Sequence, residues 1–511
     1  MPKYNRDGNS MSQDSAHYFE QTHSDAKRGR WLDAFLVAII LAFCLLRMHN
    51  LLADFPTQSI YADDWSWFTD EGWYSSAALN LHQTGRWVQA GDWSPGIAMP
   101  VWPLAASAVF YFTGVNALAL RRLDVACSWL TVLLVYLLVR RYGTRRTGLF
   151  AAALVGTSAV LFFFSRLALL EEPLMMLTLA AMLLASRTGP RSYVKAVLLG
   201  ILLGLMMLTK TTAMCLFPAV LYPLLPQCKF RWRGAAGLGF AACMVAGGMY
   251  AANRYLLVRP HTAEFHDLWN RYGTSAPGLK LLMHSFLRFF YRGTWADPVL
   301  FPLALIAVFS SLLWMRRLFA NPLFATAILW CSGVAAFLIY HFYGPPRYFS
   351  LLTVPLCILC VLWCNALLAK KRILGLVAAV VIAGGACWNI FYIVDWYSRP
   401  EYQYATVSAQ IAQIVKAEPG HSRFVLGHGS AQLRLFTDLP GADDYFGPDT
   451  LDQRLTDYHP GWLVAWNGNG ADDPERFAVV ERRYRMVPKG SFAVFHDRVR
   501  NHLTLYQLDP R

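Results

Sequence analysis

The sequence predicts an α-helical membrane protein that crosses the bilayer about eleven times and ends in a small α/β domain. Composition is the first observation: 56% of the 511 residues are hydrophobic and only 15% are charged, with a mean hydropathy of +0.32. Soluble domains carry about a quarter charged residues. Apolar runs of roughly 17–25 residues, enough to span a bilayer as a helix, recur between Trp31 and Val394, and Arg or Lys closes each run.

The charge distribution sets the expected topology. The net charge is +14 and the pI about 9.3, but most of the excess lies in short clusters between apolar runs. This placement indicates topology, so no nucleic-acid partner is expected, and the positive-inside rule puts the clusters in the cytoplasm. The polar segment 1–30 has no apolar signal stretch and is expected to be a disordered cytoplasmic tail. The clusters are Lys27/Arg28/Arg30, Arg140/Arg141/Arg145/Arg146, Arg187/Arg191/Lys195, Lys229/Arg231/Arg233, Arg316/Arg317 and Lys370/Lys371/Arg372.

Residues 31–394 are therefore predicted to form the transmembrane domain, with the C-terminal domain 395–511 on the outside. We interpret Val101–Val115 as a helix at the outer interface, because a span there would move Arg140–Arg146 to the outside face. The expected spans cover residues 31–48, 122–139, 148–165, 173–186, 194–209, 212–226, 235–257, 298–315, 322–341, 349–369 and 373–394.

Three outside segments are large enough to hold a site. The first loop, 51–121, is acidic, whereas the loop 258–297 is basic and aromatic and is expected to form interfacial helices. In the C-terminal domain the runs FVLGHG (424–429), WLVAWN (462–467) and FAVV (477–480) are interpreted as short strands. The 10 cysteines lie in apolar runs or in the basic loop at Cys228, so a disulfide framework is not expected.

A pair of acids in the first loop is the first candidate for chemistry. Asp70 and Glu71 open an amphipathic stretch, so they are expected at a helix N-terminus, where the helix dipole favours anions. Capping alone would also explain the pair. Glu172 lies in a short loop between two spans, where Arg166 is available to pair with a glutamate.

Two further cations lie at the same membrane face. Lys210 interrupts an apolar stretch and Arg347 lies in a short outside hairpin, and snorkelling to the interface is the structural alternative for both. A carboxylate in such a group can take a proton from a hydroxyl or amine while that group attacks the anomeric carbon of a sugar. Lys210, Arg347 and Arg166 are the candidates for binding a lipid phosphate. A transporter or flippase of lipid-linked sugars is the alternative, although transporters place polar groups near the middle of the bilayer.

The order of motifs resembles the GT-C glycosyltransferases. The nearest branch is the bacterial group related to protein O-mannosyltransferases and to the aminoarabinose transferase that modifies lipid A. The motifs are DEGWYSSAALNLHQTGRW (70–87), PVWPLAASAVFYFTG (100–114), RRLD (121–124), SRLALLEEP (165–173), GLMMLTKTTAM (204–214) and PPRYFSLLTVPL (345–356).

The resemblance implies an inverting glycosyltransferase that takes a sugar from a polyprenyl-phosphate donor at the periplasmic face of a bacterial inner membrane. It implies catalysis by Asp70, with Glu71 beside it and Glu172 as the second-loop acid. Lys210 and Arg347 fall on family positions that are expected to face the donor phosphate. The resemblance leaves a lipid, a glycan or a protein open as acceptor.

The sequence also departs from this branch. Met99 precedes Pro100, where the aminoarabinose transferase carries a phosphate-binding Lys, and Glu172 stands where relatives usually carry Asp. No cofactor is expected. The pair Asp63-Asp64 leaves a divalent metal possible but not favoured, because loop acids are usually solvated.

Overall fold

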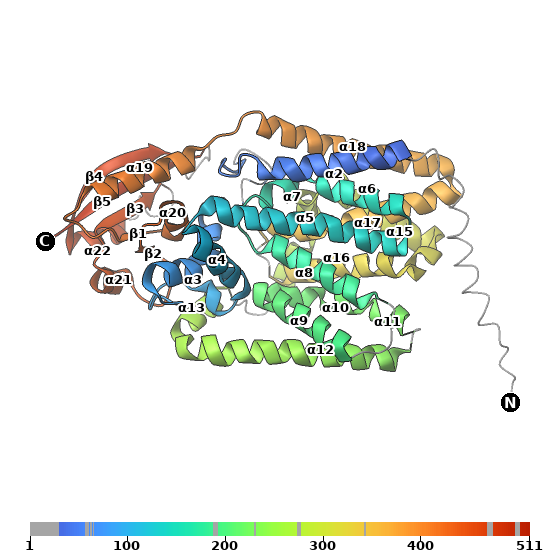
Figure 1. Cartoon of the computed structure of the whole chain (residues 1–511), viewed down its shortest axis with the longest axis horizontal. Coiled ribbons are helices and arrows are strands. Elements are labelled where there is room, and N and C mark those ends of the chain that lie inside the picture. Colours follow the sequence, from blue (N-terminus) through green and yellow to red (C-terminus); the bar gives the residue numbers. More distant parts are fainter. Residues whose placement is uncertain are drawn as a thin grey trace.

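The computed structural model describes residues 30–56, 61, 64, 66–187, 193–228, 231–272, 277–341, 344–467, 474–495 and 501–511. A bundle of roughly parallel and antiparallel helices forms one part of the molecule, and a small sheet with its own helices lies beyond one end of that bundle (Figure 1). The described residues of the predicted first outside loop, 51–121, lie between these two parts (Figure 1). Of the predicted cytoplasmic tail, only Arg30 is among the described residues.

The helical part follows the predicted apolar runs closely. In chain order it contains α2 (Arg30–Met48), α5 (Ala117–Tyr142), α6 (Arg145–Gly156), α7 (Ala159–Phe164), α8 (Glu171–Ala185), α9 (Tyr193–Thr209), η4 (Thr211–Leu216), α10 (Phe217–Leu221), α11 (Leu224–Gln227), α12 (Trp232–Asn253), α15 (Leu300–Trp314), η8 (Arg316–Ala320), α16 (Pro322–Tyr340), α17 (Pro346–Lys370) and α18 (Arg372–Tyr397).

Six helical segments in the described part of the chain are long and apolar enough to cross a membrane, or seven if a pair bent by 118° is one span. The other predicted spans are helical but shorter or interrupted. Pro218 and Pro223 break the segment from η4 to α11, because proline removes a helical hydrogen bond. A polytopic helical fold is confirmed, while the count of about eleven crossings stays a prediction.

Helix α17 is the centre of the bundle. It packs against α6, α15, α16 and α18, and 83% of its most apolar segment is buried. A helix that is apolar on every side is stable only when neighbours surround it. Arg347 therefore enters the interior at the first turn of α17.

The first outside loop forms compact structure against the bundle. A π-helical turn, η2 (Ser66–Asp70), runs directly into α3 (Glu71–Thr84), followed by η3 (Pro95–Ile97) and α4 (Val101–Thr113). The predicted helix after Asp70-Glu71 is thus confirmed. It ends at Gly85, whose left-handed φ of 72° suits a residue without a side chain. A helix is present over Val101–Thr113, and its placement at the membrane interface stays a prediction.

The basic loop contains two amphipathic helices. After α12 the chain continues through η5 (Arg254–Val258) and η6 (Arg259–His261) into α13 (Thr262–Tyr272), then α14 (Leu279–Arg292) and η7 (Gly293–Trp295). On α14, Ser285 and Phe289 are buried, whereas Leu287 and Tyr291 are exposed. An exposed apolar stripe beside basic residues is typical of a helix lying at a membrane surface.

The C-terminal domain is a five-stranded mixed sheet with strand order β2-β1-β3-β5-β4. Strand β1 pairs in parallel with β2 and β3, and β5 pairs antiparallel with β3 and β4. The elements are α19 (Gln403–Ala417), β1 (Val425–Gly427), α20 (Ser430–Thr437), β2 (Gly441–Ala442), α21 (Leu451–Tyr458), β3 (Trp462–Trp466), α22 (Pro474–Glu481), β4 (Tyr484–Ala493) and β5 (His502–Pro510).

Two of the three predicted strands are confirmed as β1 and β3, but the prediction for FAVV (477–480) is wrong. These residues belong to α22, which begins at Pro474. Proline is favoured in the first turn of a helix. Arg476 and Val480 are buried while Ala478 is exposed, which is the spacing of a helix face and not of a strand.

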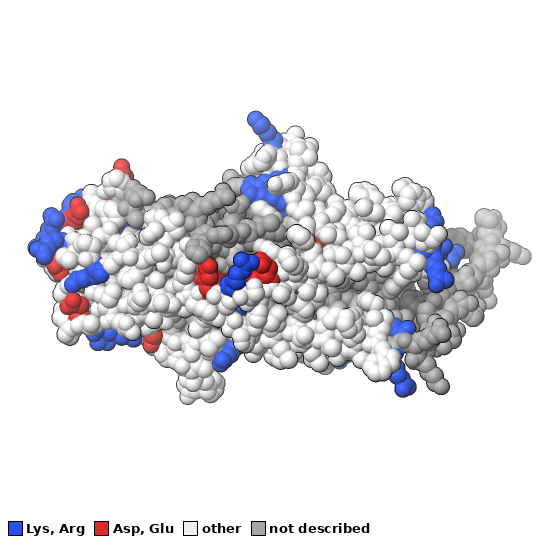
Figure 2. All heavy atoms as spheres, turned by 90° about the horizontal axis from the view of Figure 1, so that it is seen from above, with Lys and Arg blue, Asp and Glu red and all other residues white. Residues whose placement is uncertain are grey.

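The distribution of charge on the surface follows the division into a helical bundle and a C-terminal domain. On the face seen in Figure 2, Lys and Arg gather near one end of the helical part, charges of both signs lie on the opposite end of the molecule, and a small group of acidic and basic side chains lies midway. The surface between that midway group and the Lys and Arg end is almost uncharged. Such a belt is what a bilayer requires of the surface that it covers. The ten cysteines are free thiols.

Candidate functional site

Four chain segments meet between the helical bundle and the C-terminal domain. They are Asp64 with η2, the start of α8, the residue that precedes η4, and the start of α17. Their polar side chains form what we call the ion cluster: Asp64, Asp70, Glu171, Lys210 and Arg347. All five are buried, with at most 4% of each residue exposed.

Arg347 is the hub of the ion cluster. Its Nη1 donates to Asp64 Oδ1 at 2.7 Å, and its Nη2 lies 2.5 Å from Asp70 Oδ2. The Asp64 carboxylate also accepts the backbone N–H of Arg347 at 2.7 Å, so it caps the N-terminus of α17. An aspartate there offsets the cost of placing a cation at the positive end of a helix. The Thr69 hydroxyl donates to the other oxygen of Asp70 at 2.9 Å.

Lys210 and Glu171 form the second half of the cluster. The Lys210 ammonium donates to Glu171 Oε1, which lies 3.8 Å from Arg347 Nε. Lys210 Nζ also lies 4.0 Å from the centre of the Tyr348 ring, a cation–π contact. Among the described residues, neither Glu171 Oε2 nor Arg347 Nε has a hydrogen-bond partner. The cluster therefore keeps unused polar atoms in a buried place, where such atoms are costly without a ligand.

Electrostatics favours proton acceptance by Asp70. Burial raises the pKa of Asp70, and the nearby Asp64 and Glu171 carboxylates raise it further, while Arg347 and the Thr69 hydroxyl oppose the rise. Three acids and two bases leave the cluster with one excess negative charge. A carboxylate with a raised pKa that stays paired to a cation is suited to general-base work near neutral pH.

Glu71 lies beside Asp70 in the chain but takes part in a different set of contacts. Arg121 binds it in a bidentate manner, with N–O distances of 2.8 and 2.6 Å. The backbone N–H of Ala168 and the amide of Gln432 donate to it as well, both at 2.8 Å. We call this group the Glu71 node. All four hydrogen bonds reach a carboxylate that is fully buried, so Glu71 has no lone pair facing the ion cluster's cations.

Two predicted site residues lie outside the ion cluster. The Arg166 guanidinium donates to the carbonyl oxygens of Arg47 (3.0 Å), His49 (2.7 Å) and Asn50 (2.5 Å), which closes the C-terminal end of α2. Glu172 is 2% exposed, and its polar neighbours are the Thr131 hydroxyl and the Arg47 guanidinium, neither of which belongs to the ion cluster. The structure thus brings together Asp70, Lys210 and Arg347, and leaves Glu71, Arg166 and Glu172 apart from them.

Asp64 and Glu171 belong to the cluster but were not among the predicted site residues. Asp64 was interpreted as a solvated loop acid, whereas it is completely buried against Arg347. Glu171 directly precedes Glu172, the acid that was chosen. The Asp-Asp and Glu-Glu pairs were visible signals, but the sequence did not indicate which member of each pair faces inward. Asp63 lies outside the described residues.

The acids do not fit a metal site well. Each of Asp64, Asp70 and Glu171 is already paired with Arg347 or Lys210, and a divalent cation would be repelled by both bases. In the described part of the chain, one group of possible ligand atoms lies within 4.8 Å, in His428, Asp443 and Asp444. Three backbone N–H groups bind Asp443, and Arg476 pairs with Asp444. We therefore derive no step through a metal.

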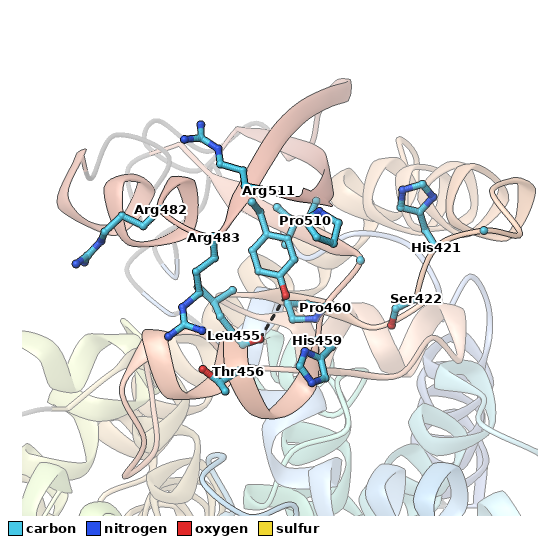
Figure 3. A pocket seen from close by; sticks show the side chains of 14 residues that line it. His421, Ser422, Leu455, Thr456, His459, Pro460, Arg482, Arg483, Pro510 and Arg511 are labelled. Carbon is cyan, nitrogen blue, oxygen red and sulfur yellow. Dashed lines mark hydrogen bonds between the residues drawn. The ribbon is translucent and has the colours of Figure 1, made fainter.

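A cavity of about 700 Å³ in the C-terminal domain lies apart from these residues. Figure 3 shows Arg482 and Arg511 extending away from one another and Arg483 turned toward α21. Arg483 binds Asp452 with two N–O distances of 2.8 Å. The charged side chains of this cavity point apart or are already paired, so they do not converge on a position where a ligand could bind.

The chain was compared with protein families, with curated sequences and with solved structures. Residues 95–258 match the family described as dolichyl-phosphate-mannose-protein mannosyltransferase. No curated protein sequence matches the chain. The matched segment contains Glu171, Glu172 and Lys210, begins after Asp70 and ends before Arg347.

Solved structures match over nearly the whole chain. ArnT from Cupriavidus metallidurans bound to undecaprenyl phosphate has a TM-score of 0.60 and 14% identity, covering 94% of this chain and 98% of that one. Its apo state gives 0.61 and 14%, with 92% and 97% covered. The oligosaccharyltransferase of Archaeoglobus fulgidus, in complex with zinc and sulfate, gives 0.52 and 12%, with 88% and 71% covered.

At these identities the solved structures establish the fold, and the family match adds a segment of sequence that carries three of the charged residues discussed above. Both comparisons agree with the resemblance to the GT-C glycosyltransferases that the sequence motifs indicated. The chain therefore has the fold of ArnT and of the archaeal oligosaccharyltransferase, and one segment of it, residues 95–258, matches the mannosyltransferase family.

Proposed function

We propose that this protein transfers a sugar from a polyprenyl-phosphate donor to an acceptor at the periplasmic face of a bacterial inner membrane, with inversion at the anomeric carbon. The observation that carries the proposal is the ion cluster, in which the buried Asp70 carboxylate lies beside two cations. Support for a polyprenyl-phosphate donor comes from the similar folds of ArnT bound to undecaprenyl phosphate and of an oligosaccharyltransferase bound to dolichol-phosphate.

Asp70 acts as the general base. It takes the proton of an acceptor hydroxyl or amine while the acceptor atom forms a bond to the anomeric carbon. The bond between that carbon and the phosphate oxygen breaks in the same step, and its electron pair stays on the phosphate. A single displacement from the side opposite the leaving group inverts the anomeric centre.

Lys210 and Arg347 receive the leaving phosphate. Arg347 Nε–H carries no hydrogen bond within the described part of the structure, so it can donate to a phosphate oxygen while Nη2 keeps its contact with Asp70. Lys210 is a point charge on a flexible stem and exchanges Glu171 for phosphate. Fixed cations at the place where negative charge develops lower the barrier to departure.

The remaining predicted residues take supporting roles in this scheme. Glu71 holds the backbone beside Asp70, and Arg166 holds the end of α2. Glu172 remains a predicted catalytic acid, with Thr131 and Arg47 as its polar neighbours. The acceptor is a lipid, a glycan or a protein, the N-terminus is cytoplasmic and the C-terminal domain is periplasmic.

The test is transfer activity in reconstituted proteoliposomes with a panel of polyprenyl-phosphate sugars. Asp70→Asn removes the base but keeps the side-chain size, and we expect a loss of at least about 100-fold in kcat with donor still bound. Asp395→Asn is the matched control, because Asp395 lies in an exposed ion pair with Arg399. Anomer analysis of the product by NMR tests inversion.

Full activity of Asp70→Asn contradicts the assignment of the base. An absence of transfer by the wild-type protein from every donor, combined with movement of lipid-linked sugar across the bilayer, identifies a transporter instead.

A further inference from the structure

Helix α20 of the C-terminal domain touches the backbone next to the catalytic Asp70. A Cβ atom placed on Gly72 would lie 2.2 Å from the carbonyl carbon of Ala431 and 2.2 Å from the nitrogen of Gln432. Real side-chain atoms do not approach that closely, so Gly72 lets two backbones from distant parts of the chain meet.

Gln432 uses this proximity to make two hydrogen bonds. Its Oε1 accepts the backbone N–H of Gly72 at 2.8 Å, and its Nε2 donates to Glu71 Oε2 at 2.8 Å. The side chain is completely buried. The Gly72 N–H belongs to the first turn of α3, where backbone N–H groups have no partner within the helix. One carboxamide therefore satisfies a helix end and a buried carboxylate together.

These two bonds complete the Glu71 node around the residue that follows Asp70. Arg121 and the Ala168 N–H hold Glu71 from the bundle, and Gln432 holds it from the C-terminal domain. The Arg121 guanidinium also lies 5.3 Å from the centre of the Phe436 ring of α20. Because a peptide bond joins Glu71 to Asp70, the position of the Asp70 backbone depends on contacts made from both domains.

We propose that Gln432 is a positioning residue of the glycosyl transfer, through which the C-terminal domain sets the orientation of Asp70 toward the acceptor. This inference rests on the proposed role of Asp70 as the base. A displacement of about 1 Å at a reacting group can lower a rate about 100-fold. The C-terminal domain thus forms part of the active site without touching the reacting atoms.

The first experiment compares Gln432→Met with Gln83→Met in proteoliposomes. Methionine keeps the length of the side chain and removes both hydrogen bonds. Gln83 lies across the same domain interface, where it bonds Asp438 and Arg434, but it is on the last turn of α3, away from Asp70. We expect Gln432→Met to lower kcat at least tenfold with donor KM changed less than twofold, and Gln83→Met to leave both within twofold.

A second variant keeps the test decisive if Gln432→Met folds poorly. In Gln432→Glu, the protonated carboxylic acid has the hydrogen-bond pattern of the amide: its carbonyl accepts from Gly72 and its hydroxyl donates to Glu71. The ionised form repels Glu71. We therefore expect the ratio of its kcat to that of the wild type to rise as the pH is lowered from about 8 to about 5.

Wild-type kcat for Gln432→Met, or a pH-independent ratio for Gln432→Glu, overturns the inference while leaving the proposed function intact. Wild-type kcat for Asp70→Asn overturns the assignment of Asp70 as the base, and an absence of transfer by the wild-type protein overturns the proposed function itself. The two failures are therefore distinguishable.

Discussion

Two neighbouring carboxylates in one chain segment have opposite surroundings in this protein. Asp70 belongs to the ion cluster, where three acids share two cations, and one polar atom each of Glu171 and Arg347 has no hydrogen-bond partner among the residues that the structure describes. Glu71 belongs to a node in which a bidentate arginine, a backbone N–H and an amide satisfy it completely. Saturated buried networks give rigidity, whereas partly satisfied ones bind ligands or do chemistry.

The difference teaches how a rigid part supports a reactive one. The node joins α3, α5, the loop before α8, and α20, so it fixes the backbone on which Asp70 stands. The ion cluster can then exchange partners during a reaction without loss of the local fold. Activity and stability should therefore respond separately to changes in the two regions.

The largest expected effect on stability comes from Glu71→Gln. The substitution leaves Arg121 without its carboxylate in a buried place, and removing one partner of a buried pair costs about 3–5 kcal/mol. We expect a clear fall in the Tm measured in detergent, whereas Asp70→Asn, which relieves the excess negative charge of the ion cluster, should leave the Tm unchanged. An unchanged Tm for Glu71→Gln with activity lost would instead make Glu71 a catalytic residue.

The next effect is a pH dependence of the interface between the first loop and the C-terminal domain. Burial raises the pKa of Asp92 to about 7, although Arg454 and Arg434 oppose the rise. The folded protein therefore holds this proton more tightly than the unfolded chain, whose aspartates titrate near 3.9. The contribution to stability is complete below about pH 4 and is lost as the pH rises through about 7.

Thermal unfolding in detergent across this pH range checks the prediction. The Tm should decrease with rising pH in the wild type, and Asp92→Asn should flatten part of that slope. An identical slope in the variant would show that Asp92 does not keep its proton in the folded state.

The smallest of these effects concerns donor binding by Lys210. Lys210→Gln removes a positive charge from the ion cluster but keeps a hydrogen-bond donor for Glu171. We expect the KM for the polyprenyl-phosphate donor to rise about tenfold, equivalent to about 1.4 kcal/mol. Lys195→Gln is the control, since Lys195 bonds the carbonyl oxygens of Ala185 and Arg187 at the other end of the helices. Equal KM values for both variants would remove Lys210 from the phosphate site.

The sequence predicted more of the helices than of the site. Apolar runs identified the helices of the bundle because burial in a bilayer acts on many consecutive residues. The strand predicted at FAVV (477–480) failed because four apolar residues are too few to distinguish a strand from a helix, and Pro474 started a helix there. Asp70, Lys210 and Arg347, which the structure brings together, were predicted because Asp70 opens an amphipathic stretch and the two cations border apolar ones.

Within each pair of acids, only the tertiary structure decided which member faces the cations. Successive residues of a helix point about 100° apart, so Asp70 and Glu71 contact different partners, and so do Glu171 and Glu172. The sequence by itself determined the membrane-spanning class, the helical ranges and the presence of buried charge at one end, because these depend on local composition. The partner of each charge depends on helix rotation and domain docking, which are set by packing between residues far apart in the chain.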